Sequence, residues 1–108
     1  MEFRFHKQLY SDGLSPNKIS SAKRKIMHGA KTLNMFLITL PIGGEGILEI
    51  YWYPELTQKI YQDMDVTVTV VGLAKSREDA FSLVERIVKD IGVYNGEISV
   101  IDYFGENS

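Results

Sequence analysis

The residues whose types and spacing best suit binding chemistry lie between positions 40 and 56, where three glycines precede three consecutive aromatic residues. Glycine-rich backbone can present N–H groups to a phosphate, and aromatic rings can stack on a planar ligand. A phosphate loop, however, usually leads into a helix and carries a Gly-Lys-Ser/Thr or G-x-G-x-x-G pattern. Neither pattern is present, and the residues after Gly46 alternate like a strand. The segment from Gly43 to Gly46 is therefore predicted to be a hairpin turn.

The three aromatic residues at positions 51–53 cannot all share one surface. Successive side chains of a strand point to opposite faces, so Tyr51 and Tyr53 are expected on one face with Glu49, and Trp52 on the other. Packing in the core or against a second subunit is the favoured interpretation. A small-molecule or nucleotide site formed with the glycine turn is the alternative. Stacking of single-stranded RNA is a further one, but Glu49 would repel phosphate.

A second candidate surface is the polar face of a helix predicted over residues 16–31. Ser15 and Pro16 suit the N-cap and the first helical position, and apolar residues recur on one side at helical spacing. Such a face is often only solvated, but it can also bind nucleic acid, an anionic membrane or an acidic protein. The apolar side carries no aromatic residue, which disfavours a membrane. The residues of the basic face are Lys18, Arg24, Lys25, His28 and Lys31.

Charge is divided unevenly along the chain, although its formal net value is only −2. Residues 1–31 hold seven basic and two acidic residues, whereas residues 32–108 hold five basic and twelve acidic ones. The net charge makes nucleic acid an unfavourable partner. The asymmetry instead suits an acidic protein partner, including a second copy of the chain.

The inventory for catalysis and metal binding is small. With no cysteine, the chain can form neither disulfides nor thiolate sites. His6 and His28 belong to different predicted elements, and no second histidine stands at metal-ligand spacing. Asp63 and Asp65 could hold a cation, but aspartates at such a junction usually cap or turn. No metal site, cofactor or nucleophile–base set is predicted; an enzyme with its site across a dimer interface is kept as an alternative.

Hydrophobic periodicity predicts the elements that must position these residues. Phe3, Phe5 and Leu9 indicate an opening edge strand. Ser76 suits the N-cap of a second long helix, and Gly92 suits its C′ position. The other predicted elements are strands over 33–40, 47–53, 65–73 and 96–104, and one or two helical turns within 55–62.

This order, (β)-α-β-β-(α)-β-α-β, predicts one α+β domain over residues 1–108, an α/β two-layer sandwich. Its four- to five-stranded mixed sheet is expected to carry both long helices on one face. The topology resembles the ferredoxin-like sandwich with an added strand and short helix, and this resemblance implies no function. No apolar run has the length of a membrane span or signal peptide, so a cytoplasmic location is expected. The predicted function is a small non-catalytic interaction domain that acts through homodimerisation and a protein partner.

Overall fold

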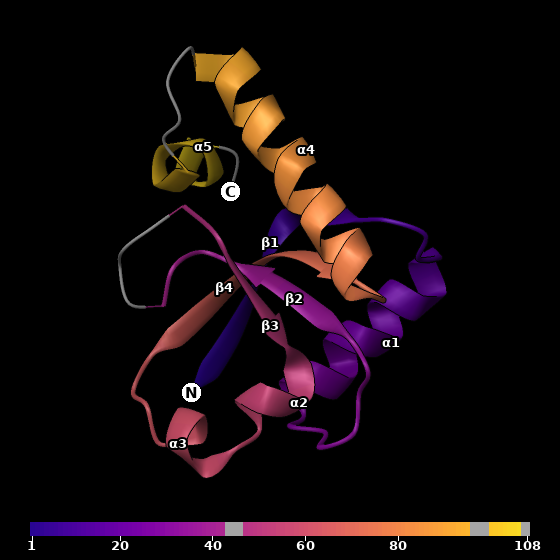
Figure 1. Ribbon diagram of the computed structural model, residues 1–108. Helices are drawn as coiled ribbons and strands as arrows, with labels where there is room; N and C mark the ends of the chain where they lie inside the picture. The colour runs from indigo at the N-terminus through magenta and orange to yellow at the C-terminus, as the bar shows by residue number, and fades with distance from the viewer. Residues whose placement is uncertain (43–46, 96–99, 107–108) are drawn as a thin grey trace.

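A computed structural model describes residues 1–42, 47–95 and 100–106, and its centre is a four-stranded mixed sheet (Figure 1). The strands lie in the order β1-β4-β2-β3, so β1 and β3 form the two margins. β1 runs parallel to β4, and β2 is antiparallel to both β4 and β3. The predicted mixed sheet, the β2–β3 hairpin and the edge position of the first strand are confirmed. The strands are β1 (Glu2–Ser11), β2 (Phe36–Thr39), β3 (Glu49–Trp52) and β4 (Thr67–Ala74).

Two long helices accompany the sheet, as the hydrophobic periodicity predicts. The Ser15 side chain caps the first helix by accepting the Lys18 N–H, and the Ser76 side chain accepts the Asp79 N–H at the start of the other. The second long helix continues beyond Gly92, so the predicted C′ role of this glycine is wrong. The helices are α1 (Pro16–Met27), α2 (Tyr53–Leu56), α3 (Lys59–Gln62), α4 (Arg77–Asn95) and α5 (Val100–Glu106).

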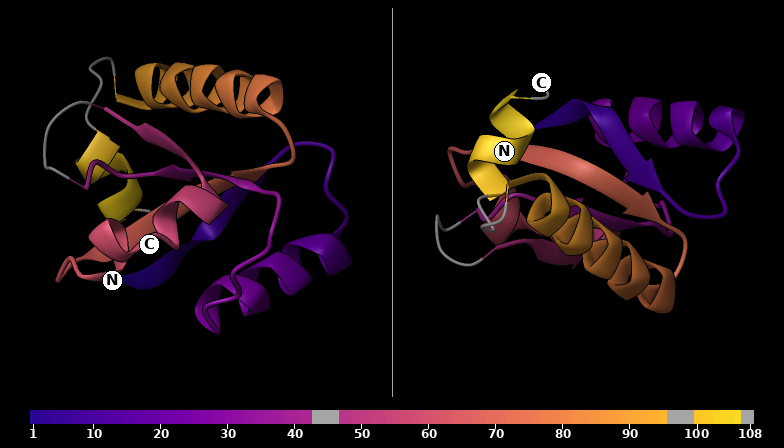
Figure 2. Two further views of the ribbon diagram at one scale, coloured as in Figure 1. Left: turned by 60° about the horizontal axis from the view of Figure 1, so that its bottom comes forward. Right: turned by 90° about the horizontal axis from the view of Figure 1, so that it is seen from above.

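The long helices cover opposite faces of the sheet, which corrects the expectation that both lie on one face (Figure 2). Ala22 and Ile26 of α1 pack in one buried cluster with Val70 of β4. Leu83 and Ile87 of α4 pack in a second cluster, together with the next residue of β4, Val71. Consecutive valines of β4 point to opposite faces, and both are fully buried. Both faces of the sheet are therefore covered at this central strand.

The C-terminal segment contains a helix where the sequence predicts a strand over residues 96–104. Residues 96–99 lie outside the described part, and Val100–Glu106 forms α5. Val100 and Phe104 stand four residues apart, so one helical face buries both of them in the cluster under α4. The β-branched residues that favour a strand are outweighed here by this burial.

A Schellman motif ends α1. The Gly29 N–H donates to the Ile26 carbonyl and the Ala30 N–H to the Lys25 carbonyl. Gly29 has a φ of 72°, the left-handed conformation that this motif requires. The glycine therefore terminates the helix instead of weakening its last turn, and it places Ala30 and Lys31 beside α2.

The middle of β1 contains an irregular bulge of several residues. Phe5 pairs with Val70 and Tyr10 with Gly72, so the residues between Phe5 and Tyr10 stand opposite Val71 alone. Buried His6 lies in this bulge, where its Nδ1 accepts the Gln8 N–H at 3.1 Å. Its Nε2 is therefore the nitrogen that donates to the Phe104 carbonyl, at 2.9 Å. The bulge thus connects the sheet to α5.

Candidate functional site

Tyr53, predicted to share a sheet face with Tyr51, belongs to the hydrophobic core. β3 ends at Trp52 because Pro54 begins a helix, so Tyr53 becomes the first residue of α2. Its side chain is 2% exposed, and its hydroxyl donates to the Ala30 carbonyl at 2.6 Å. Tyr51 and Tyr53 do lie on the same side of the sheet, in the α1 cluster. Tyr53 nevertheless offers no open stacking surface.

Tyr51 and Glu49 form a local polar network. One Glu49 carboxylate oxygen, Oε1, accepts the Tyr51 hydroxyl at 3.0 Å and the Ile42 N–H at 2.7 Å. The Tyr51 ring meets the edge of the Tyr61 ring, with centroids 6.1 Å apart. Glu49 therefore stabilises the base of the β2–β3 hairpin. The turn between Gly43 and Gly46 lies outside the described residues.

Burial, and then the hydrogen bond to Glu49, raises the pKa of Tyr51 to about 12. An unfolded tyrosine has a pKa of about 10, so the folded state holds this proton more tightly. The stability contributed by Tyr51 is fully present below pH 10 and is lost as the pH rises toward about 12. We expect the tyrosinate absorbance titrations of wild type and Tyr51→Phe to differ by one group with a pKa of about 12. A difference near the ordinary tyrosine pKa would contradict this assignment.

Trp52 is 45% exposed at the margin of the sheet, where its indole N–H donates to Asn34 Oδ1 at 3.0 Å. One hydrogen bond shows which residues of this segment point their backbone N–H and C=O groups toward β2: the Tyr53 N–H donates to the Met35 carbonyl at 2.8 Å. In an antiparallel pair, residues whose backbone groups bond to the neighbouring strand alternate with residues whose backbone groups point away from it. Odd-numbered residues of β3 therefore bond to β2, and the N–H and C=O groups of Ile50 face the outer edge.

A groove of about 530 Å³ opens on the α1 side of the molecule, between the end of α1, the start of β1 and the α2–α3 segment. We call it the α1–α3 groove. Phe3, Ile26 and Tyr53 contribute apolar side chains to it, and Met27 and Lys31 border it on the α1 side. The small-molecule hypothesis expected a concave site bordered by both tyrosines. Tyr53 borders this groove, whereas Tyr51 does not.

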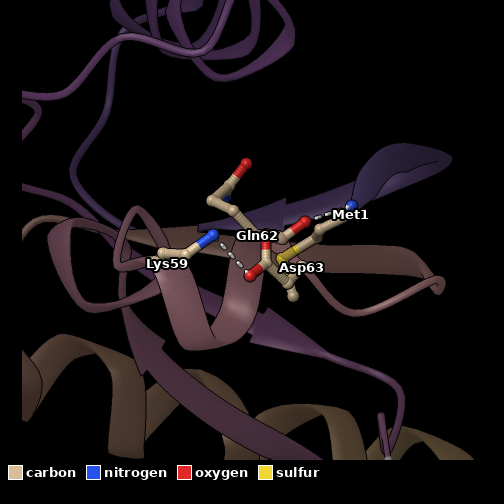
Figure 3. Close-up of polar contacts among 4 residues, drawn as sticks. All are labelled: Met1, Lys59, Gln62 and Asp63. Carbon is tan, nitrogen blue, oxygen red and sulfur yellow. Dashed lines mark hydrogen bonds and ion pairs between the residues drawn. The ribbon is translucent and has the colours of Figure 1, made fainter.

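Gln62 of α3 and Met1 both border the α1–α3 groove, and Figure 3 shows the contact between them. The Met1 nitrogen donates to the Gln62 carbonyl at 3.1 Å, which joins the start of β1 to α3. On the same helix, Lys59 Nζ lies 2.9 Å from Asp63 Oδ2. Asp63 and Asp65 are the two residues that the sequence suggested as possible cation ligands. In the structure Asp63 pairs with Lys59, and Asp65 is exposed.

The residues of the basic face all lie exposed along α1 and just beyond its end: Lys18, Arg24, Lys25, His28 and Lys31. Within the described residues, Lys59–Asp63 is the one ion pair, so these five side chains have no acidic partner there. Lys23 differs from them, because its Nζ lies 5.6 Å from the centre of the Phe5 ring. The basic face is thus an unpaired cationic surface that leads to Lys31 at the groove.

No protein-family model, curated protein or solved structure matches the chain. The described residues contain no group of three or more His, Asp or Glu side chains that could hold a metal ion. None of the helices in residues 1–42, 47–95 and 100–106 has the length and apolar character needed to cross a membrane.

Sequence reasoning identified the basic face but missed the α1–α3 groove. Its lining residues come from three separate parts of the chain, and no local spacing brings them together. The one available signal was Met27, an apolar residue outside the apolar arc of α1 and 59% exposed in the structure. An apolar residue in that position suggests contact with something other than the domain's own core.

Proposed function

We propose that the chain is a small non-catalytic interaction domain, which forms a homodimer through β3 and binds a protein partner. The observation that carries the dimer is the outer edge of β3, which pairs with no other strand of the described residues and lies next to an exposed tryptophan. An exposed edge strand with apolar side chains is a ready template for pairing with another chain. This supports an interface at Trp52 in place of the Tyr51/Tyr53 face favoured by the sequence.

The register of such a dimer follows from strand geometry. A two-fold axis normal to the sheet keeps each side chain on its own face and pairs β3 with β3 antiparallel. Because the outward backbone groups belong to even-numbered residues, Ile50 faces Ile50 of the second copy. Trp52 then stands opposite Leu48 of the second copy, on the same face. Cross-strand aromatic–aliphatic pairs of this kind stabilise antiparallel sheets.

Native mass spectrometry at low micromolar concentration tests this dimer. We expect wild type to be dimeric and Trp52→Glu to weaken the dimer at least about tenfold, because two carboxylates replace two apolar contacts. Hydrogen exchange should show concentration-dependent protection of the Ile50 amide, because this amide gains a partner only in the dimer.

Phe81→Glu is the matched control, since Phe81 is also an exposed aromatic residue but lies on α4. This variant should remain dimeric. A wild-type protein that stays monomeric at high concentration would overturn the proposed dimer. If Trp52→Glu and Phe81→Glu weakened the dimer equally, the dimer interface would not lie at β3.

A further inference from the structure

We infer that the α1–α3 groove binds an acidic segment of a partner protein, with an apolar side chain of that segment seated in the groove and a carboxylate beside Lys31. This inference builds on the proposed role in protein binding, for which it names the site and the ligand chemistry. It does not depend on the β3 dimer.

The groove has the size and the apolar surface that an anchor residue needs. Its volume of about 530 Å³ falls within the usual range for ligand sites, roughly 300–1,000 Å³. Ile26 and Tyr53 are buried and form its floor, and half-buried Phe3 supplies accessible apolar surface. Met27 is exposed at the border and can cover an inserted side chain.

The cations are distributed asymmetrically around the α1–α3 groove. Lys31 lies on the α1 side without an acidic partner among the described residues, and the basic face continues from it along α1. Glu2 lies on the β1 side next to the Met1 nitrogen, which already donates to the Gln62 carbonyl. Lys59 of α3 is already paired with Asp63. The acidic group of a ligand is therefore expected next to Lys31, and the end of the ligand near Glu2 should be neutral or basic.

A polyanion such as single-stranded RNA fits this site less well than an acidic peptide. Sequence-tolerant binding of single strands depends on aromatic rings whose faces are open for stacking. Of the two aromatic residues at the groove, Tyr53 is buried with its hydroxyl bonded to Ala30, and Phe3 is tilted against the Tyr53 ring. Glu2 at the border would also repel a continuous phosphate backbone.

Fluorescence anisotropy with three labelled heptapeptides tests the site on the full chain. The first peptide carries Leu-Phe flanked by glutamates, the second has glutamines in place of the glutamates, and the third has serines in place of Leu-Phe. We expect the first to bind at least about tenfold more tightly than either of the others. An oligouridylate of matched charge is the fourth probe, and it should bind more weakly than the first peptide.

Variants at the groove should change the affinity for the first peptide in opposite directions. Lys31→Glu should weaken binding about tenfold through like-charge repulsion, and Met27→Ser should weaken it by loss of apolar contact. Glu2→Gln should strengthen binding, because it removes a carboxylate from the border. Lys89→Glu, the same charge reversal at an exposed position of α4, should change the affinity less than about twofold.

Three results would overturn the inference. One is equal binding of the glutamate and glutamine peptides, and another is equal weakening by Lys31→Glu and Lys89→Glu. The third is tighter binding of the oligouridylate than of any peptide. None of them bears on the dimer, because Met27, Lys31 and Glu2 lie outside β3, and mass spectrometry measures the dimer separately.

Discussion

Replacing Tyr53 with alanine is expected to lower the free energy of unfolding by about 3–5 kcal/mol, measured by urea denaturation. The substitution empties a fully buried volume between α1 and the sheet. It also removes the hydrogen bond to the Ala30 carbonyl, which connects the end of α1 to α2. The loss should speed hydrogen exchange in both helices, because each depends on this side chain for its position.

Two neighbouring substitutions separate the contributions of Tyr53. Tyr53→Phe keeps the ring and leaves the Ala30 carbonyl without its partner, so it should cost about 1 kcal/mol. Trp52→Ala changes an exposed aromatic residue next in sequence and should cost less than Tyr53→Phe in the monomer. A loss for Tyr53→Ala no greater than that for Trp52→Ala would contradict the core position of Tyr53.

Replacing Phe104 with alanine is expected to cost about 3–5 kcal/mol and to release α5 from the sheet. The ring is 2% exposed, and its centroid lies 4.9 Å from that of His6 and 5.1 Å from that of Tyr103. Without this ring, α5 keeps buried Val100 and the hydrogen bonds of His6 and Tyr103. A seven-residue helix depends on tertiary packing, so the loss of its largest buried side chain should release it. Hydrogen exchange of the α5 amides should then rise toward unfolded rates.

Gly105→Ala is the matched test of helical structure at this position. A Cβ at Gly105 would meet no atom within 4 Å, and alanine favours a helix over glycine by about 1 kcal/mol. The variant should keep or raise the stability of α5. Destabilisation by Gly105→Ala together with a neutral Phe104→Ala would favour the strand that the sequence pattern predicts.

Local patterns in the sequence were sufficient to predict most of the fold. The six β-branched residues from Val66 to Val71 predicted a strand, which is β4. Ser15 and Ser76 marked the two helix starts through chemistry that acts within three residues. The consecutive apolar residues Val70 and Val71 needed a cover on each face of the sheet. The expectation that both long helices lie on one face did not include this.

The candidate site was less predictable because it depends on contacts between distant residues. Tyr53 follows the alternation of a strand, but the helix that begins with it turns its ring into the core. Val100 and Phe104 suit either a strand or a helix by type, and the buried cluster under α4 favours the helix. The α1–α3 groove is formed by residues that meet only after folding, so no spacing in the chain indicates it.

The bulge in β1 has a consequence for how far the chain can assemble. β1 forms one margin of the sheet, and its irregular backbone around His6 cannot offer evenly spaced hydrogen-bonding groups to a strand of another chain. In the proposed dimer, pairing through β3 would use the regular margin of each copy, and both outer margins of the joined sheet would be the bulged β1. In that proposed dimer growth stops at two subunits, because a two-fold interface is closed and leaves no regular strand edge for open-ended polymerisation.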